Sequence, residues 1–249
     1  MKRFPPEFSD LLNEKGLCIL RGTSAEGRLF TLSDRYFAAF HNLISPRVAE
    51  DCIRLLDKHL LDSLAVEERC IPPESITEMT ENYQEILNKT IHVKTAFFRR
   101  RTSRSYRAAE EIGLLRMLKS DSFALFAEAL SGLKLNRDRG IQLSCYEHGD
   151  YAGPHNDHHP EYEPYKNGFI DFHVMFSNNA VAHHYLVYEE NGHFSKMVNI
   201  NMKAGISVYR LPFWHYTTPL MGKRGRETEA RRWLMLGSFE ILSDQDYRR

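Results

Sequence analysis

Residues 141–157 read Ile-Gln-Leu-Ser-Cys-Tyr-Glu-His-Gly-Asp-Tyr-Ala-Gly-Pro-His-Asn-Asp, and the pattern of apolar residues along the chain changes here. The stretch opens on a short, largely alternating segment typical of a strand with one buried face. More such segments follow, separated by turn residues at 178–179, 191–192 and 203–205. The expected strands are 141–147, 169–176, 184–188, 196–200, 206–211 and 233–241. Six short strands without helices between them predict an antiparallel sandwich or jelly roll.

The first half of the chain carries helical patterns instead. Ser45 and Pro46 form a start signal for a helix over 46–63, whose apolar residues recur at helical spacing. The same spacing predicts helices over 108–118 and 122–130, the second ended by Gly132. Two short apolar runs, 17–20 and 29–32, are bounded by glycine and predict edge strands. We therefore expect a mainly helical flank with short extra strands over 1–139, and a β core over 140–249.

The composition excludes some classes of partner. The 249 residues include 33 basic and 33 acidic side chains, and this zero net charge argues against a whole-surface affinity for nucleic acid or anionic membranes. No apolar run approaches the ~18–20 residues that span a bilayer, and none follows the N-terminus as in a secretory signal. The four cysteines form no CxxC pair and predict free thiols in a reducing compartment. We expect a cytoplasmic protein without a membrane or nucleic-acid partner.

Three residues suggest a metal site. His155 and Asp157 are two positions apart, so in an extended segment their side chains would point to the same face. His215 follows a predicted strand in the block Gly-Ile-Ser-Val-Tyr-Arg-Leu-Pro-Phe-Trp-His over 205–215. Two histidines and one carboxylate suit iron(II), because they leave three coordination positions open. The pair His155 and Asp157 alone is a weak signal, and the order of the other motifs strengthens it.

The last predicted strand begins with arginine, in the run Arg-Arg-Trp-Leu-Met-Leu-Gly-Ser-Phe over 231–239. Arg232 shares a face with Leu234 and Leu236, whereas Arg231 faces the other way. An arginine inside a barrel needs an anionic partner, because a buried unpaired charge is very costly. The distal carboxylate of a dicarboxylate would match its planar fork.

The order of Tyr146, the His-x-Asp pair, His215 and Arg232 resembles the 2-oxoglutarate/iron(II)-dependent dioxygenase superfamily, in particular its prolyl-hydroxylase-like branch. The resemblance covers about residues 140–240. It implies an α+β fold with a double-stranded β-helix (jelly-roll) core and N-terminal helices packed outside it. It further implies iron(II) held by His155, Asp157 and His215, with no catalytic residue beyond these ligands. Arg232 would bind 2-oxoglutarate, Tyr146 would hydrogen-bond it, and O2 would be the oxidant.

The chain departs from this pattern at several places. A longer insertion separates His215 from Arg232, so Arg231 or Arg226 are alternatives for the anion-binding arginine, and Arg232 is alternatively a surface residue paired with an acid. Tyr146 is alternatively a packing aromatic. The extra histidines form two groups: substrate-pocket or second-sphere residues (His158, His159, His173), and residues that face solvent or line the barrel mouth (His183, His184, His193).

The implied reaction hydroxylates a C–H bond while 2-oxoglutarate is decarboxylated to succinate and CO2. We expect a small-metabolite substrate, an amino acid or natural-product intermediate, with prolyl-type hydroxylation of a protein side chain as the alternative. Two rivals are a zinc metallohydrolase, which would leave Arg232 unexplained, and a non-catalytic jelly-roll binding module.

The arginine-rich segment 97–107 is either an anion-binding surface or a solvated loop, and we favour the loop. The charged segment 222–230 predicts a mobile loop.

Overall fold

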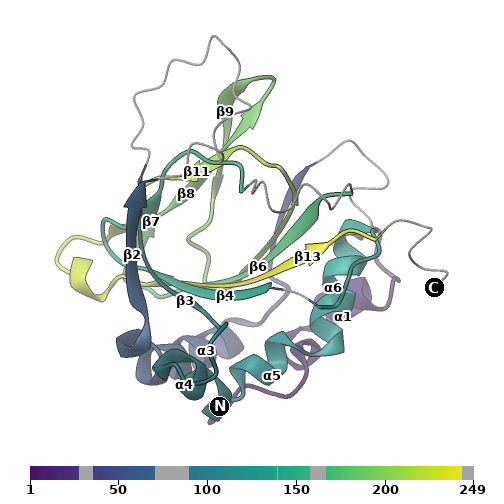
Figure 1. Ribbon diagram of the computed structural model, residues 1–249, viewed down its shortest axis with the longest axis horizontal. Coiled ribbons are helices and arrows are strands. Elements are labelled where there is room, and N and C mark those ends of the chain that lie inside the picture. Colours follow the sequence, from purple (N-terminus) through teal and green to yellow (C-terminus); the bar gives the residue numbers. More distant parts are fainter. Residues whose placement is uncertain (28–35, 71–89, 139, 158–166, 243–249) are drawn as a thin grey trace.

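The computed structural model describes residues 1–27, 36–70, 90–138, 140–157 and 167–242. Strands curl into two facing walls, and helices cover the outer side of one of them (Figure 1). The strand predicted at 29–32 and the histidines His158 and His159 lie outside the described residues. This arrangement confirms the predicted jelly-roll core.

The larger sheet has eight strands, in the order β1-β10-β6-β13-β4-β3-β2 with β5 paired to β3. Every pairing within it is antiparallel. Its strands are β1 (Phe37–His41), β2 (Ala65–Cys70), β3 (Thr90–Phe97), β4 (Gly140–Tyr146), β5 (Tyr151–Ala152), β6 (Phe169–Ser177), β10 (Gly205–Leu211) and β13 (Arg232–Glu240). The last strand, β13, therefore lies centrally, between β4 and β6.

Two smaller sheets form the opposing wall. One has three strands in the order β11-β8-β9, namely β11 (His215–Thr217), β8 (Tyr185–Glu190) and β9 (His193–Asn199). The other pairs β12 (Met221–Gly222) with β7 (Val181–His183). An isolated bridge joins His155 to His215, so the predicted metal-binding segment is tied to the edge of the three-stranded sheet.

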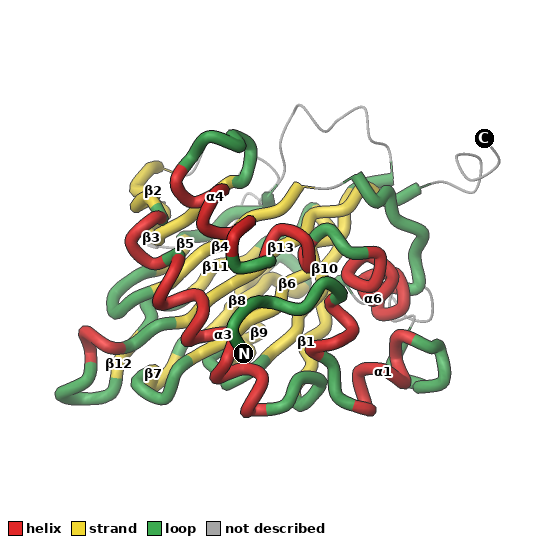
Figure 2. Tube along the Cα trace, turned by 90° about the horizontal axis from the view of Figure 1, so that it is seen from below, coloured by secondary structure: helices red, strands yellow, loops and turns green. Residues whose placement is uncertain are grey.

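Helices lie across the outer face of the larger sheet (Figure 2). They are α1 (Glu14–Leu20), α3 (Pro46–His59), α4 (Arg104–Glu111), α5 (Leu114–Leu118) and α6 (Asp121–Ser131), with 3₁₀ turns η1 (Phe8–Leu11), η2 (Leu61–Ser63) and η5 (Glu227–Glu229). A cluster of Phe8, Phe123 and Phe126 packs on Phe172 of β6, with ring centroids 4.8–5.9 Å from the Phe172 ring. None of the helices described is long and apolar enough to cross a membrane.

The predicted helices are confirmed at two places and wrong at a third. Ser45 caps α3 by accepting a hydrogen bond from the Val48 N–H, and α6 ends at Gly132 with φ +77°. The helix predicted over 108–118 is broken at Gly113, whose φ of +79° ends α4 and starts α5. The strand predicted at 17–20 is also wrong. These residues belong to α1, because the Asn13 side chain caps that helix at the Gly16 N–H.

All six strands predicted in the second half are present, with ends shifted by up to three residues. Sequence patterns missed β1, β2 and β3, which join the same sheet from the first half of the chain. Strand β2 is almost entirely exposed and shows no alternation, so its sequence carried no strand signal. The segment 222–230 contains part of β12 and the turn η5, whereas a loop was predicted.

Candidate metal centre

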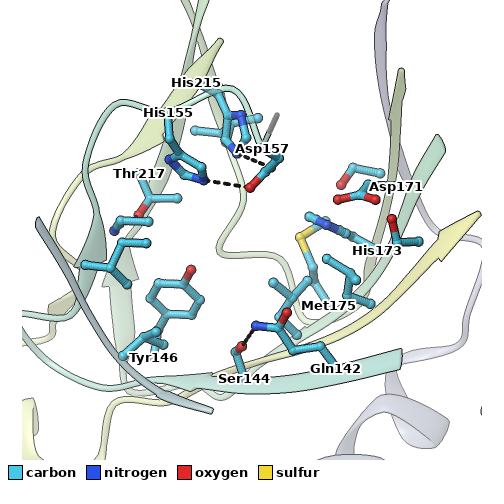
Figure 3. A pocket seen from close by; sticks show the side chains of 18 of the residues that line it. Gln142, Ser144, Tyr146, His155, Asp157, Asp171, His173, Met175, His215 and Thr217 are labelled. Atoms are coloured by element: carbon cyan, nitrogen blue, oxygen red, sulfur yellow. Dashed lines mark hydrogen bonds and ion pairs between the residues drawn. The ribbon is translucent and has the colours of Figure 1, made fainter. Parts of the chain in front are cut away.

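The three predicted ligands converge at one end of the interior (Figure 3). The backbones of His155 and His215 exchange two hydrogen bonds of 3.0 and 2.9 Å, which hold their ring centroids 4.4 Å apart. Asp157 turns its carboxylate toward both rings, with Oδ1 3.2 Å from His155 Nε2 and Oδ2 3.6 Å from His215 Nε2. Their possible ligand atoms all lie within 4.8 Å of one another.

The backbone at Asp157 departs from regular strand alternation. Asp157 has φ +56°, in the left-handed region that non-glycine residues adopt only at a cost of roughly 1–2 kcal/mol. The expectation of an extended segment through Asp157 is therefore wrong, although the carboxylate still meets the imidazole. Such conformations persist where the surrounding structure imposes them, and they are concentrated at functional sites.

Hydrogen bonds orient both imidazole rings. Nδ1 of His155 donates to the Gly153 carbonyl at 2.6 Å, and Nδ1 of His215 donates to the Phe213 carbonyl at 2.7 Å. Since a carbonyl only accepts, each Nδ1 carries a proton, and Nε2 is the nitrogen of each ring that can bind a metal. Both Nε2 atoms are thus turned toward Asp157, as in metal-binding histidines held by outer hydrogen bonds.

Burial and mutual charge set the protonation of the three groups. Burial lowers the pKa of His155, but the Asp157 carboxylate outweighs it and leaves that pKa raised. Burial lowers the pKa of His215 to about 4, with a further contribution from His155. Burial alone would raise the pKa of Asp157, but His155 and His215 hold it well below its usual range. At neutral pH the cluster offers an ionised carboxylate and at least one neutral imidazole, which are ligand forms.

Arg232 lies in the same cavity, which has a volume of about 240 Å³. Its side chain is buried, Nε donates to the Ile200 carbonyl at 3.1 Å, and Nη2 contacts Met175 Sδ at 2.7 Å. Nη1 has no hydrogen-bond partner within the described residues. Burial lowers the pKa of this guanidinium to about 10, so it stays charged at neutral pH.

The other candidate arginines lie outside the cavity. Arg231 faces the opposite side of β13 and pairs with Glu147 at 3.4 Å, and exposed Arg226 pairs with Glu229 at 2.8 Å. The alternative of a surface ion pair is therefore wrong for Arg232. Tyr146, directly opposite Arg232 in register, is buried and points its hydroxyl toward the metal cluster (Figure 3). Burial raises the pKa of Tyr146 to about 12, so the hydroxyl keeps its proton.

The remaining histidines divide differently from the prediction. His173 lines the cavity, as expected, and its Nε2 lies 3.1 Å from the Tyr209 hydroxyl. Burial, and then the charge of Arg232, lower the pKa of His173 to about 3. His184 was expected at the solvent or the barrel mouth, which is wrong. It is fully buried with its ring 5.0 Å from the Tyr146 ring, at the short break between β7 and β8.

Sequence reasoning missed Asp171, which is 4% exposed and lines the cavity. The signal was present in the predicted strand 169–176, because alternation places Asp171, His173 and Met175 on one face. A carboxylate on the interior face of a jelly-roll strand is itself unusual, since acidic residues are rarely buried without a partner.

Comparison with known proteins gives the fold its context. No family model matches the chain, and no curated protein matches it by sequence. Among solved structures, an oxidoreductase of the 2OG-Fe(II) oxygenase family from Burkholderia pseudomallei aligns over 82% of this chain and 85% of its own, with a TM-score of 0.51 and 11% identity. The fold is that of a 2OG-Fe(II) oxygenase.

Two further matches to this oxygenase fold have lower TM-scores. A prolyl hydroxylase from Trichoplax adhaerens, in complex with a hypoxia inducible factor peptide fragment, aligns over 91% of this chain and 89% of its own, at 12% identity and a TM-score of 0.46. The non-heme alpha ketoglutarate dependent epimerase SnoN, from nogalamycin biosynthesis, aligns over 86% of this chain and 80% of its own, at 12% identity and a TM-score of 0.49.

Proposed function

We propose that the protein is an iron(II)- and 2-oxoglutarate-dependent dioxygenase that hydroxylates a C–H bond of a small metabolite. In this proposal His155, Asp157 and His215 hold the metal, Arg232 binds the distal carboxylate of 2-oxoglutarate, and Tyr146 hydrogen-bonds it. The observation that carries the proposal is the buried, incompletely partnered guanidinium of Arg232 in the cavity that also contains the His-Asp-His cluster.

The donor set fits iron(II). It consists of two imidazole Nε2 atoms and one carboxylate, all on residues that line the cavity. Two histidines and one carboxylate with open positions are the ligand type of non-haem iron(II) oxygenases. A zinc hydrolase would accept similar ligands, but it gives Arg232 no role.

The anion site fits 2-oxoglutarate. No described carboxylate pairs with Arg232, and an unpaired charge in this environment would cost several kcal/mol. A bound carboxylate would offset that cost and use the free Nη1. The Arg232 guanidinium lies 5.2 Å from the Tyr146 ring, and the Tyr146 hydroxyl points toward the metal cluster (Figure 3), so a dicarboxylate anchored on Arg232 would extend past this hydroxyl.

The bound iron(II) and 2-oxoglutarate would supply, with O2, the oxidising chemistry whose products are succinate, CO2 and a hydroxylated substrate. The protein's own groups prepare this site. The Gly153 and Phe213 carbonyls fix the two ligand rings, and Arg232 orients the cosubstrate by its charge. The apolar side chains of Leu186 and Leu234 line the cavity and limit water around these polar groups.

A small, polar substrate suits the remaining wall of the cavity. Asp171, His173 and Ser207 are all buried and line it, so a ligand reaching them must enter the interior. A free amino acid or natural-product intermediate would do so more readily than a protein surface. A flexible peptide side chain, as in prolyl-type hydroxylation, is the second candidate.

Succinate formation tests the proposal against its rivals. Purified protein is reconstituted with iron(II) under anaerobic conditions, supplied with 2-oxoglutarate, and then exposed to O2. We expect O2-dependent succinate in the wild type and none in His215→Ala, at equal protein concentration. Absence of succinate from the wild type would favour the metallohydrolase or the non-catalytic binding module.

A further inference from the structure

Asp171 is a buried acid that neither the metal nor the cosubstrate requires. It lies on β6, is 4% exposed and lines the cavity. Its Oδ1 has no hydrogen-bond partner within the described residues. Figure 3 shows it across the cavity from Tyr146, on the wall that also carries His173. The carboxyl group therefore faces the space left for the primary substrate.

The neighbours of Asp171 provide hydroxyl groups but no cation. Its register partners are Tyr209 of β10 and Ser238 of β13, and Ser207 lies two residues before Tyr209 on β10. Ser207 and Ser238 both line the cavity. No lysine or arginine forms an ion pair with Asp171 in the part of the chain that the structure describes. An ionised Asp171 therefore has no ion-pair partner among the described lysines and arginines, and a cationic ligand would supply one.

Burial raises the pKa of Asp171 to about 8, and the charge of Asp157 adds to the increase, while Ser238 opposes it. A cation held by Asp157 would remove that second contribution. An ammonium group beside Asp171 would favour the ionised carboxylate and lower this pKa further. This is the reverse of the situation at Arg232, where the missing partner is an anion.

We propose that Asp171 recognises the primary substrate by pairing with a protonated amine on it. This inference rests on the proposed function for the identity of the reaction, but amine binding itself is independent of it. An ammonium group carries three N–H donors, which suit Asp171 together with the hydroxyl oxygens of Ser207 and Ser238. It also brings the charge that a neutral hydroxyl or carbonyl lacks. The substrate class is therefore a small amine, such as an amino acid.

Calorimetry on the zinc-loaded protein tests the proposal without turnover. The probes are the twenty common amino acids and their decarboxylated amines. For each compound that binds, the titration is repeated with the analogue that carries a hydroxyl group in place of the amine. We expect at least one amine to bind and its hydroxyl analogue to bind at least about tenfold more weakly. Asp171→Asn should weaken binding of the amine by a similar factor and leave binding of the hydroxyl analogue unchanged.

Two controls test whether Asp171→Asn still folds and whether the loss of any carboxylate at the cavity has the same effect. Circular dichroism and thermal unfolding check that Asp171→Asn folds, and Glu67→Gln removes a carboxylate at the same cavity that Arg69 already pairs with. We expect Glu67→Gln to weaken amine binding much less than Asp171→Asn does.

The inference is wrong if no amine in the panel binds, if hydroxyl analogues bind equally well, or if Asp171→Asn binds the amine normally. Succinate formation without amine binding would contradict only this inference, whereas amine binding without succinate would contradict only the proposed function.

Discussion

The guanidinium carbon of Arg232 lies 5.2 Å from the centre of the Tyr146 ring, and the two residues are direct register partners on β13 and β4. A cation–π contact of this kind contributes about 0.5–2 kcal/mol, less than the cost of burying the charge. The contact therefore fixes the direction of the guanidinium without satisfying it. This explains why a buried arginine can remain prepared for an anionic ligand.

Replacing Arg232 should abolish tight cosubstrate binding. We expect Arg232→Ala to raise the Kd for 2-oxoglutarate by about thirtyfold or more, because loss of a buried charged hydrogen-bond partner costs about 2–5 kcal/mol. Calorimetry on the manganese-loaded protein measures this. The matched control is Arg231→Ala, which removes the adjacent arginine from the opposite face and should change the Kd little. Equal effects of both variants would contradict the assignment.

Replacing His215 should remove metal binding while the fold remains. The His215→Ala variant loses one of three ligands, and we expect its affinity for Mn(II) to fall by more than about a hundredfold. Calorimetric titration of the metal-free protein gives the affinity, and His193→Ala on exposed strand β9 is the control. Metal binding that survives in His215→Ala would place the metal elsewhere.

The buried imidazole of His173 should make the metal-free protein less stable in acid. Its pKa is lowered to about 3, so below pH 6.5 the unfolded state binds a proton that the folded state does not. Between pH 7 and pH 5 this removes about 2 kcal/mol of stability. Urea denaturation of wild type and His173→Gln at both values checks this. The loss should be about 2 kcal/mol smaller in the variant, and an identical loss would disprove the prediction.

The indole of Trp233 anchors the central strand to the helical layer. Its Nε1 donates to Asp57 Oδ1 of α3 at 2.8 Å. Asp57→Ala would leave this buried N–H unpaired and should lower the free energy of unfolding by about 1–3 kcal/mol. The exposed Asp62 of η2 provides the control variant Asp62→Ala, expected to change stability by less than about 0.5 kcal/mol. Equal stabilities of the two variants would show that the anchor contributes nothing.

Gly237 lets helix α6 approach β13 closely. A Cβ at this position would lie 2.6 Å from Cε1 of Phe123, within the packed core. We expect Gly237→Ala to destabilise the protein by about 1–3 kcal/mol. Gly140→Ala, at a glycine of neighbouring β4 with open space around it, should be tolerated. Thermal unfolding of both variants would settle the comparison, and an equally stable Gly237→Ala would show that the layer can shift.

Local patterns predicted the second half of the fold because its strands alternate and end at turn residues. They also predicted that Arg232 and Arg231 would face opposite sides of β13, which follows from strand geometry alone. Strand β2 escaped prediction because both of its faces are largely exposed and it is held by pairing with β3. A short stretch of sequence does not reveal that its backbone pairs with a distant strand.

The site was predicted by the order of its motifs, but its geometry was not. The left-handed backbone conformation of Asp157 is not predicted by any spacing rule. The burial of His184, between β7 and β8 with its ring beside Tyr146, depends on tertiary packing, and its neighbours in sequence did not indicate it. Asp171 was visible on the inward face of its strand, but a single buried acid has meaning only once the cavity is known.

The most direct test of the central claim is an anaerobic titration of the iron(II)-loaded protein with 2-oxoglutarate, followed by its metal-to-ligand charge-transfer absorption. The account predicts that a band appears in the wild type, is absent in His215→Ala, and needs much more 2-oxoglutarate in Arg232→Ala than in Arg231→Ala. A wild-type protein that binds iron(II) but develops no band would contradict it.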